Sequence, residues 1–150
     1  MTTIVLCIDG SEGAARAARA GVSVLRPADT VLVVTVVEGT DPTHAYDGTG
    51  HAGPTMTEAQ FNALRQEELR KAQVIVDETV KQLGLENQLG RVVEGTAGPE
   101  LCAVARAEEA SAIVIGSRGR GRLKRALLGS VSDYVVRNAP CPVVVVGERP

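Results

Sequence analysis

Aromatic residues are almost missing from this chain. Among its 150 residues there is no tryptophan, with two tyrosines and one phenylalanine, while apolar residues make up 44% of the total. A folded core must therefore be built mainly from valine, alanine, leucine and isoleucine side chains. The same shortage argues against a protein that stacks single-stranded bases on aromatic rings.

Cysteines are also few, and they lie far apart at positions Cys7, Cys102 and Cys141. No two of them form a Cys-x-x-Cys pair, so their spacing indicates neither a zinc-binding knuckle nor a disulfide framework. Each has apolar neighbours in the sequence, which is typical of a small buried side chain. Because the chain also begins without a basic and apolar leader, we expect a reducing, cytoplasmic setting.

Neither charge nor hydropathy indicates a nucleic acid or a membrane as partner. The formal net charge of −2 at pH 7 gives no overall attraction to an anionic polymer or bilayer. No apolar run approaches the roughly 20 residues that a membrane-spanning helix needs. The length suits a single domain, residues 1–150, that is large enough to bury a core.

Buried strands alternate with helices along the sequence. Short apolar runs rich in β-branched residues predict strands covered on both faces. These runs are Thr3–Ile8, Thr30–Val37, Leu89–Gly95, Ser111–Gly116 and Pro140–Gly147. The alternation predicts an α/β fold, an open and mostly parallel sheet with helices on both faces. In a sheet ordered 3-2-1-4-5 the first and fourth strands are neighbours, and ligands bind beyond their carboxyl ends.

Capping and breaking residues mark the ends of the longest helix. It is expected to begin near Thr57, which forms a capping box with Gln60, and to end at Gly84. Its buried stripe is predicted to be Ala72, Val76, Val80 and Leu83.

Two further segments carry expectations of their own. The final helix is predicted from about Ser130 to Asn138, with Val131, Tyr134 and Val135 pointing inward. The Gly39 to Met56 stretch is expected to be a long loop, and whether it closes over a ligand is left open.

Both histidines lie in that loop, at His44 and His51. With Asp47 they could suggest a metal site, but a solvated loop is the preferred interpretation, so no metal site is predicted.

One segment, Val114 to Val136, combines glycines with positive charge. Gly116, Gly119 and Gly129 bracket a run of arginines directly after the fourth predicted strand. Glycine adopts positive φ angles and leaves the backbone open to a ligand, so several amides could face one anion. A helix that begins at Ser130 adds unpaired amides and a favourable dipole.

From these residues alone, a phosphate cradle and a plain surface loop both remain open. Arg118 and Arg120 between two amide-lined edges would make a triphosphate clamp, with Ser130 and Ser132 as hydroxyl donors. The arginines could equally form a solvated face, and Ser130 could be an ordinary helix cap. Asp9, after the first strand, could be either a ligand group or the cap of the first helix.

Known phosphate-binding fingerprints do not match this segment, which has neither Gly-Lys-Ser/Thr nor Gly-x-Gly-x-x-Gly. It does match the pattern Gly-x2-Gly-x9-Gly-(Ser/Thr) of the universal stress protein family. The opening "CIDGSEGA" is similar to that family's Asp-x-Ser-x-x-Ala turn, and "NAPCPVVVV" is similar to its last strand. The resemblance covers essentially the whole chain.

This resemblance implies a five-stranded parallel, Rossmann-like fold in the order 3-2-1-4-5. It also implies a homodimer formed by pairing the last strands, Val143 to Val146, and membership of the branch that binds ATP, with or without Mg²⁺. β-Branched residues at a sheet edge suit such pairing.

The resemblance also assigns positions in the nucleotide site. Asp9 is expected on the ribose or metal side, and the backbone of Val36 at the adenine edge. Gly119 is expected to leave room for the phosphates. The other positions line the nucleoside and phosphate path or hold the phosphates: Ile115, Gly116, Gly129, Ser130, Val131 and Ser132.

No catalytic set can be assembled from the sequence. Asp9 is the only acid that can be placed near the phosphates, and no Ser-His-Asp or Cys-His arrangement is evident. We therefore expect an ATP-binding regulatory dimer of the stress response rather than an enzyme. A module that prefers AMP or cyclic AMP, and a slow ATPase acting as a timer, stay open as alternatives.

Overall fold

The computed structural model describes residues 2–25, 30–39, 57–84, 88–118 and 128–147. Strands and helices alternate through these residues, as the sequence predicts. Their bounds are β1 (Thr3–Cys7), α1 (Glu12–Val24), β2 (Thr30–Val37), α2 (Glu58–Leu83), β3 (Gln88–Glu94), α3 (Ala97–Ala107), β4 (Ala112–Gly116), α4 (Ser130–Asn138) and β5 (Val143–Val146). Apart from Gly39, the predicted Gly39 to Met56 loop lies outside the described residues.

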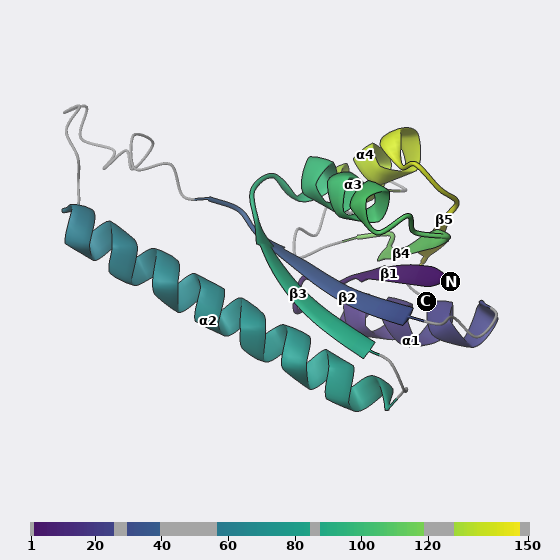
Figure 1. Ribbon diagram of the computed structural model, residues 1–150, viewed down its shortest axis with the longest axis horizontal. Helices are drawn as coiled ribbons and strands as arrows, with labels where there is room; N and C mark the ends of the chain where they lie inside the picture. The colour runs from purple at the N-terminus through teal and green to yellow at the C-terminus, as the bar shows by residue number, and fades with distance from the viewer. Residues whose placement is uncertain (1, 26–29, 40–56, 85–87, 119–127, 148–150) are drawn as a thin grey trace.

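The strands form one parallel sheet in the order β3-β2-β1-β4-β5. Helices α3 and α4 cover one face of the sheet, and α1 and α2 cover the other (Figure 1). This confirms the predicted α/β fold class and the strand order 3-2-1-4-5. β1 and β4 are neighbours, with Ile4 paired to Ala112, so the predicted crevice beyond their carboxyl ends can form.

The core is aliphatic and lies in two layers, one on each face of the sheet. Successive side chains of β2 enter opposite layers, since a strand directs them alternately to its two faces. Leu32 and Val34 pack toward α3 and α4, whereas Val31 and Val33 pack toward α1 and α2. Val33 and Val34 are both fully buried, so β2 is apolar on both faces, as its unbroken apolar sequence predicts.

Helix α2 begins and ends where its sequence predicts. Thr57 Oγ1 accepts from the Gln60 N–H (3.2 Å), and Gln60 Oε1 accepts from the Thr57 N–H (2.8 Å), which confirms the capping box. Gly84 ends the helix in the left-handed conformation, with φ at 58°. In the predicted stripe Ala72 and Val76 are buried, while Val80 and Leu83 are half-buried.

Helix α2 also extends past the sheet at its N-terminal end (Figure 1). A bidentate pair between Arg65 and Glu94, with N–O distances of 2.6 and 2.7 Å, joins this part of the helix to the end of β3. Both side chains are exposed, so the pair fixes the position of α2 more than it adds to stability. In the part of the chain that the structure describes, no helix is long and apolar enough to cross a bilayer.

The prediction that Tyr134 points inward is wrong. Val135 is fully buried, but the Tyr134 side chain remains 40% exposed. Its ring lies over Gly98 of α3, where an added Cβ would come within 2.7 Å of the ring. The tyrosine ring therefore packs against α3 at Gly98, where the missing side chain leaves room for it. The sequence pattern of α4 alone does not reveal this contact.

Candidate functional site

The carboxyl ends of β1, β2 and β4 open onto one cavity of about 810 Å³. The starts of α3 and α4 and one side of α2 complete its wall. All the described residues that the sequence predicts for the site line it: Asp9, Val36, Ile115, Gly116, Arg118, Gly129, Ser130, Val131 and Ser132. The other two predicted residues, Gly119 and Arg120, lie outside the described residues.

The loop after β1 settles the question of which residue caps α1. Ser11 is the N-cap, and its Oγ accepts from the Ala14 N–H (3.1 Å). Asp9 instead accepts from the Ser11 N–H through Oδ1 (2.8 Å), which fixes its carboxylate in a tight turn. Asp9 is therefore not the cap of the helix, and its half-buried side chain stands at the cavity.

The start of α4 presents backbone amides to the same cavity. Gly129 is its N-cap, so no side chain caps this end of the helix. The Gly129 N–H donates to the Ser117 carbonyl (2.7 Å), and the Gly129 carbonyl accepts from the Asp133 N–H (2.9 Å). The amides of Ser130, Val131 and Ser132 fall between these two bonds, in the first turn that a helix cannot satisfy from within. Such a helix end attracts anions.

The Ser132 hydroxyl holds this arrangement together. It is 2% exposed and donates toward the carbonyl oxygens of Ser117 and Gly129, each at 3.0 Å. Because a hydroxyl has one proton, that proton is used within the loop. The sequence predicted that the Ser132 hydroxyl would donate a hydrogen bond to a phosphate, but its proton is already used within the loop. The Ser132 amide still borders the cavity. Ser130 is exposed at the helix start.

Gly116 does not use the positive φ angle that the sequence suggested for it, and Gly119, the other glycine of that expectation, lies outside the described residues. Among the described residues, neither Gly116 nor Gly129 has a positive φ. An added Cβ would meet its nearest atoms at 3.4 Å for Gly116 and 3.5 Å for Gly129, which are ordinary contact distances. At Gly98, by contrast, a Cβ would press into the Tyr134 ring. The internal packing therefore requires glycine at Gly98 but not at the two cavity positions.

One wall of the cavity comes from α2 and was missed by the sequence reasoning. Leu64, Glu68, Lys71, Ala72 and Ile75 line it, at the spacing of one helix face. The three- and four-residue spacing was the available signal, but it does not distinguish a cavity wall from a core stripe.

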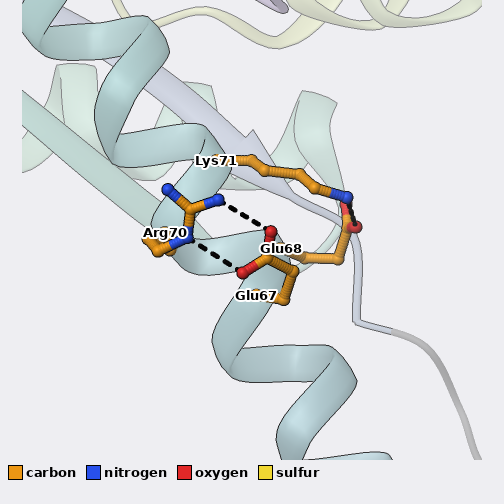
Figure 2. Close-up of polar contacts among 4 residues, drawn as sticks. All are labelled: Glu67, Glu68, Arg70 and Lys71. Carbon is orange, nitrogen blue, oxygen red and sulfur yellow. Dashed lines mark hydrogen bonds and ion pairs between the residues drawn. The ribbon is translucent and has the colours of Figure 1, made fainter.

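The α2 wall carries an ion pair between Lys71 Nζ and Glu68 Oε1, at 3.0 Å. Figure 2 shows that this pair extends to one side of the helix, whereas the neighbouring Glu67–Arg70 pair lies on another. Glu38, at the end of β2, also lines the cavity. Asp9 is thus joined there by two carboxylates that the sequence did not place near a ligand.

The cysteines behave as the sequence predicts. Cys7 and Cys102 are buried, Cys141 is half-buried, and all three are free thiols in or against the same core layer. Burial, and secondarily the nearby Cys102 and Cys141, raise the pKa of the Cys7 thiol far above its ordinary range. Cys7 borders the cavity, yet it remains a protonated and unreactive thiol there.

No metal site is formed by the described residues, among which no three His, Cys, Asp or Glu side chains are grouped to hold an ion. The His44, Asp47 and His51 set lies outside the described residues.

Comparison with known proteins identifies the family. The sequence model of the universal stress protein family matches residues 1–147. The chain belongs to this family. A universal stress protein of Thermus aquaticus is 31% identical over 144 residues, which are 96% of this chain and 97% of that relative. A universal stress protein of Mycobacterium tuberculosis is 34% identical over 151 residues, but this chain spans about half of its length (49%).

Solved structures of universal stress proteins share the fold. UspA of Lactobacillus plantarum is 21% identical with a TM-score of 0.78, and 97% of each chain is covered. A universal stress protein in complex with cAMP is 22% identical with a TM-score of 0.64, covering 97% of this chain and 96% of its own. The Arabidopsis thaliana protein with AMP bound is 13% identical with a TM-score of 0.60, covering 99% and 93%. An Archaeoglobus fulgidus relative in complex with dAMP has a TM-score of 0.56 at 21% identity, covering 97% and 96%.

Proposed function

We propose that this universal stress protein binds ATP in the cavity beyond β1, β2 and β4. It would act in the cytoplasm as a regulatory homodimer of the stress response rather than as an enzyme, with neither a nucleic acid nor a membrane as partner. Structurally similar members of the family hold AMP, dAMP or cAMP, which supports an adenine nucleotide as the ligand class. A cavity of about 810 Å³ is of the size that small-molecule sites have.

The observation that carries this proposal is the start of α4. Three successive amides, those of Ser130, Val131 and Ser132, border the cavity behind a glycine cap that offers them no side chain. At α1 and α2, by contrast, the side chains of Ser11 and Thr57 each accept from an amide of the first turn. The side chain of Thr96 makes no such bond at the start of α3. A helix end that is open toward a cavity is suited to an anionic group such as a phosphate.

ATP rather than AMP is proposed because the phosphate-facing features extend beyond one helix end. Arg118 and Gly116 both border the same cavity. The pattern Gly116-x2-Gly119-x9-Gly129-Ser130 is the one that resembles the ATP-binding branch. Asp9 is the carboxylate that we place on the ribose side, or beside Mg²⁺ if the ion accompanies the nucleotide.

Mass spectrometry of the nucleotide released from protein purified without additives tests this directly, and we expect ATP or ADP. Calorimetry with ATP, ADP, AMP and cyclic AMP on one sample then ranks the ligands. A preference for ATP supports a clamp on the outer phosphates. Equal affinity for AMP and ATP would instead favour the second candidate, an AMP or cyclic AMP module, to which the complexes of similar proteins also point.

The homodimer is proposed to form through β5. This strand is an edge of the sheet, with Val143 and Val145 packed toward one core layer and Val144 and Val146 toward the other. Its outer backbone groups are therefore available to pair with a second copy.

We also propose that the protein binds ATP without hydrolysing it. If the protein showed Mg²⁺-dependent ATP hydrolysis that disappeared in Asp9→Asn, the alternative function, a slow ATPase, would be supported instead.

A further inference from the structure

Helix α4 lies between the cavity and the last strand of the sheet. Its first turn borders the cavity, behind the Gly129 cap. Its other end is followed by β5 after residues 139–142 alone, and Pro140 and Pro142 are two of these residues. Because proline fixes the backbone, this short link is stiff, and a movement of α4 is passed on to the start of β5.

Ser117 connects the same two elements a second time. Its carbonyl oxygen accepts from the Gly129 N–H (2.7 Å) and from the Ser132 hydroxyl (3.0 Å), both in the first turn of α4. Its own N–H donates to the carbonyl of Val146 (2.9 Å), the last residue of β5. Both ends of β5 are therefore attached to α4, one through the chain and the other through Ser117.

Apart from these attachments, β5 is held less firmly than the strands inside the sheet. It has four residues, it pairs with β4 on one side, and all of its side chains are half-buried. A strand with few buried contacts opens easily by itself. Before a second copy can pair with β5, the strand must be fixed in place, and this ordering costs conformational entropy.

The outer side of α4 faces the same edge of the molecule. Val135 is fully buried against the sheet, and Tyr134 lies over Gly98 of α3. Val136 follows Val135 by roughly 100° around the helix, so it lies on the side away from α3. Since α3 packs on β2 and α4 on β5, that side faces the β5 edge (Figure 1). Val136 is 46% exposed and extends the apolar edge that β5 offers to a second copy.

We propose that α4 couples nucleotide binding to dimerisation, so that a phosphate at its first turn strengthens the pairing of a second copy along β5 and Val136. This rests on the proposed nucleotide site and the proposed homodimer. The phosphate bonds the open amides and holds the first turn of α4, and Ser117 then holds the end of β5. Because this ordering is complete before the second copy arrives, the second copy binds more tightly. By linkage, the dimer binds ATP more tightly than the monomer does, by the same factor for each site.

Sedimentation velocity over a range of protein concentrations gives the dissociation constant of the dimer without nucleotide and with saturating ATP. We expect ATP to lower this constant by about fivefold for each nucleotide bound, and so by about 25-fold for two in a dimer. Equilibrium binding of radiolabelled ATP, on protein diluted below and concentrated above that constant, should give affinities that differ by the same factor of about five.

Three variants of the full chain test the role of α4. Val136→Lys places an ammonium group in the proposed contact, and Val74→Lys is its matched control on α2, at a valine of similar exposure (42%). Val136→Lys should weaken the dimer by at least about tenfold, because the charge would be buried without a partner, while circular dichroism shows it folded. Val74→Lys should not weaken it. Ser132→Ala removes a bond to Ser117, so ATP should strengthen its dimer by a smaller factor.

Each result bears on a different part of the proposal. A protein that binds ATP and dimerises, but with the same dimer constant in both conditions, has no coupling, and a dimer that ATP weakens has coupling of the wrong sign. Equal effects of Val136→Lys and Val74→Lys would exclude α4 from the contact. If no ATP binds, the proposed nucleotide site fails, and if the protein stays monomeric at every concentration, the proposed homodimer fails. In both of these cases the coupling is refuted as well.

Discussion

Ser132 Oγ lies 3.0 Å from the carbonyl oxygen of Ser117, across the segment that joins β4 to α4. The same oxygen accepts from the Gly129 N–H at 2.7 Å. One carbonyl at the end of β4 is therefore bonded twice to the first turn of α4. These bonds determine where the amides of that turn stand relative to the cavity.

Replacing Ser132 with alanine should weaken both the fold and the site. The hydroxyl is buried, so we expect a loss of about 1 kcal/mol in the free energy of unfolding. Nucleotide affinity should fall as well, because the helix start is held less firmly. Denaturant unfolding and calorimetry measure the two effects. Ser130→Ala, at an exposed position of the same turn, should leave the free energy of unfolding within about 0.5 kcal/mol.

Placing a carboxylate at Gly129 should change stability and binding in opposite directions. Gly129 has φ −71° and ψ 164°, which suits an aspartate cap, and a Cβ there meets no atom closer than 3.5 Å. In Gly129→Asp the carboxylate would cap the first amides of α4, raising the free energy of unfolding by roughly 0.5 kcal/mol. It would also occupy the donors and repel a phosphate, so ATP affinity should fall by at least about tenfold.

Gly129→Ala is the control for that experiment, since it adds a methyl group but neither charge nor acceptor. It should lose far less ATP affinity than the aspartate variant. A stabilised Gly129→Asp protein that still binds ATP at full affinity would show that the phosphates do not lie at α4.

The sequence was most informative where one local interaction defines a structure. Thr57 and Gln60 bond each other three residues apart, and Gly84 alone supplies the left-handed residue that ends α2. Strand β2 was predicted at its observed bounds, Thr30–Val37, because a short apolar run rich in β-branched residues favours a buried strand over a helix. The alternation of these elements is sufficient to predict a parallel sheet.

What depends on contacts between distant segments was predicted less well. Tyr134 lies outside because of Gly98, which is far away in the sequence. The α2 wall, with Glu68 and Lys71, borders the cavity because the helix runs past the ends of the strands. The sequence of α2 alone does not predict this placement of the helix relative to the sheet.

Burial of the Cys7 thiol predicts a loss of stability at alkaline pH. Burial raises its pKa in the folded protein, whereas the unfolded chain has the ordinary value of 9.0. Above that pH the unfolded state releases the proton and the folded state keeps it, so rising pH favours unfolding. The contribution of Cys7 is therefore complete below about pH 9 and declines above it, by up to about 1.4 kcal/mol per pH unit.

Urea unfolding at several pH values between about 8 and 10.5 measures this decline. Cys7→Ala should start from a lower stability, because a buried side chain is shortened, but it should decline less steeply with pH. Lysine and tyrosine titration affects both proteins alike and cancels in the comparison. Identical slopes in the two proteins would contradict a protonated, buried Cys7.

A proline at Val145 should separate the proposed dimer without breaking the sheet. The Ile113 N–H donates to the Pro142 carbonyl, and the Ser117 N–H donates to the Val146 carbonyl, so even-numbered residues of β5 direct their backbone groups toward β4. By alternation, the Val145 N–H points to the outer edge, where a second copy would pair. Proline is tolerated at such an edge position, but it removes the donor that strand pairing needs.

Sedimentation velocity should therefore show a dimer for the unaltered protein and a monomer for Val145→Pro, with thermal unfolding confirming that the monomer is folded. Val144→Pro is the matched control, because it removes an amide on the β4 side and should lower the unfolding temperature instead. A dimer that persists in folded Val145→Pro would place the contact between subunits elsewhere on the molecule. In that case the exposed edge of β5 would have to be protected from further strand pairing in some other way, since an uncovered apolar edge promotes aggregation.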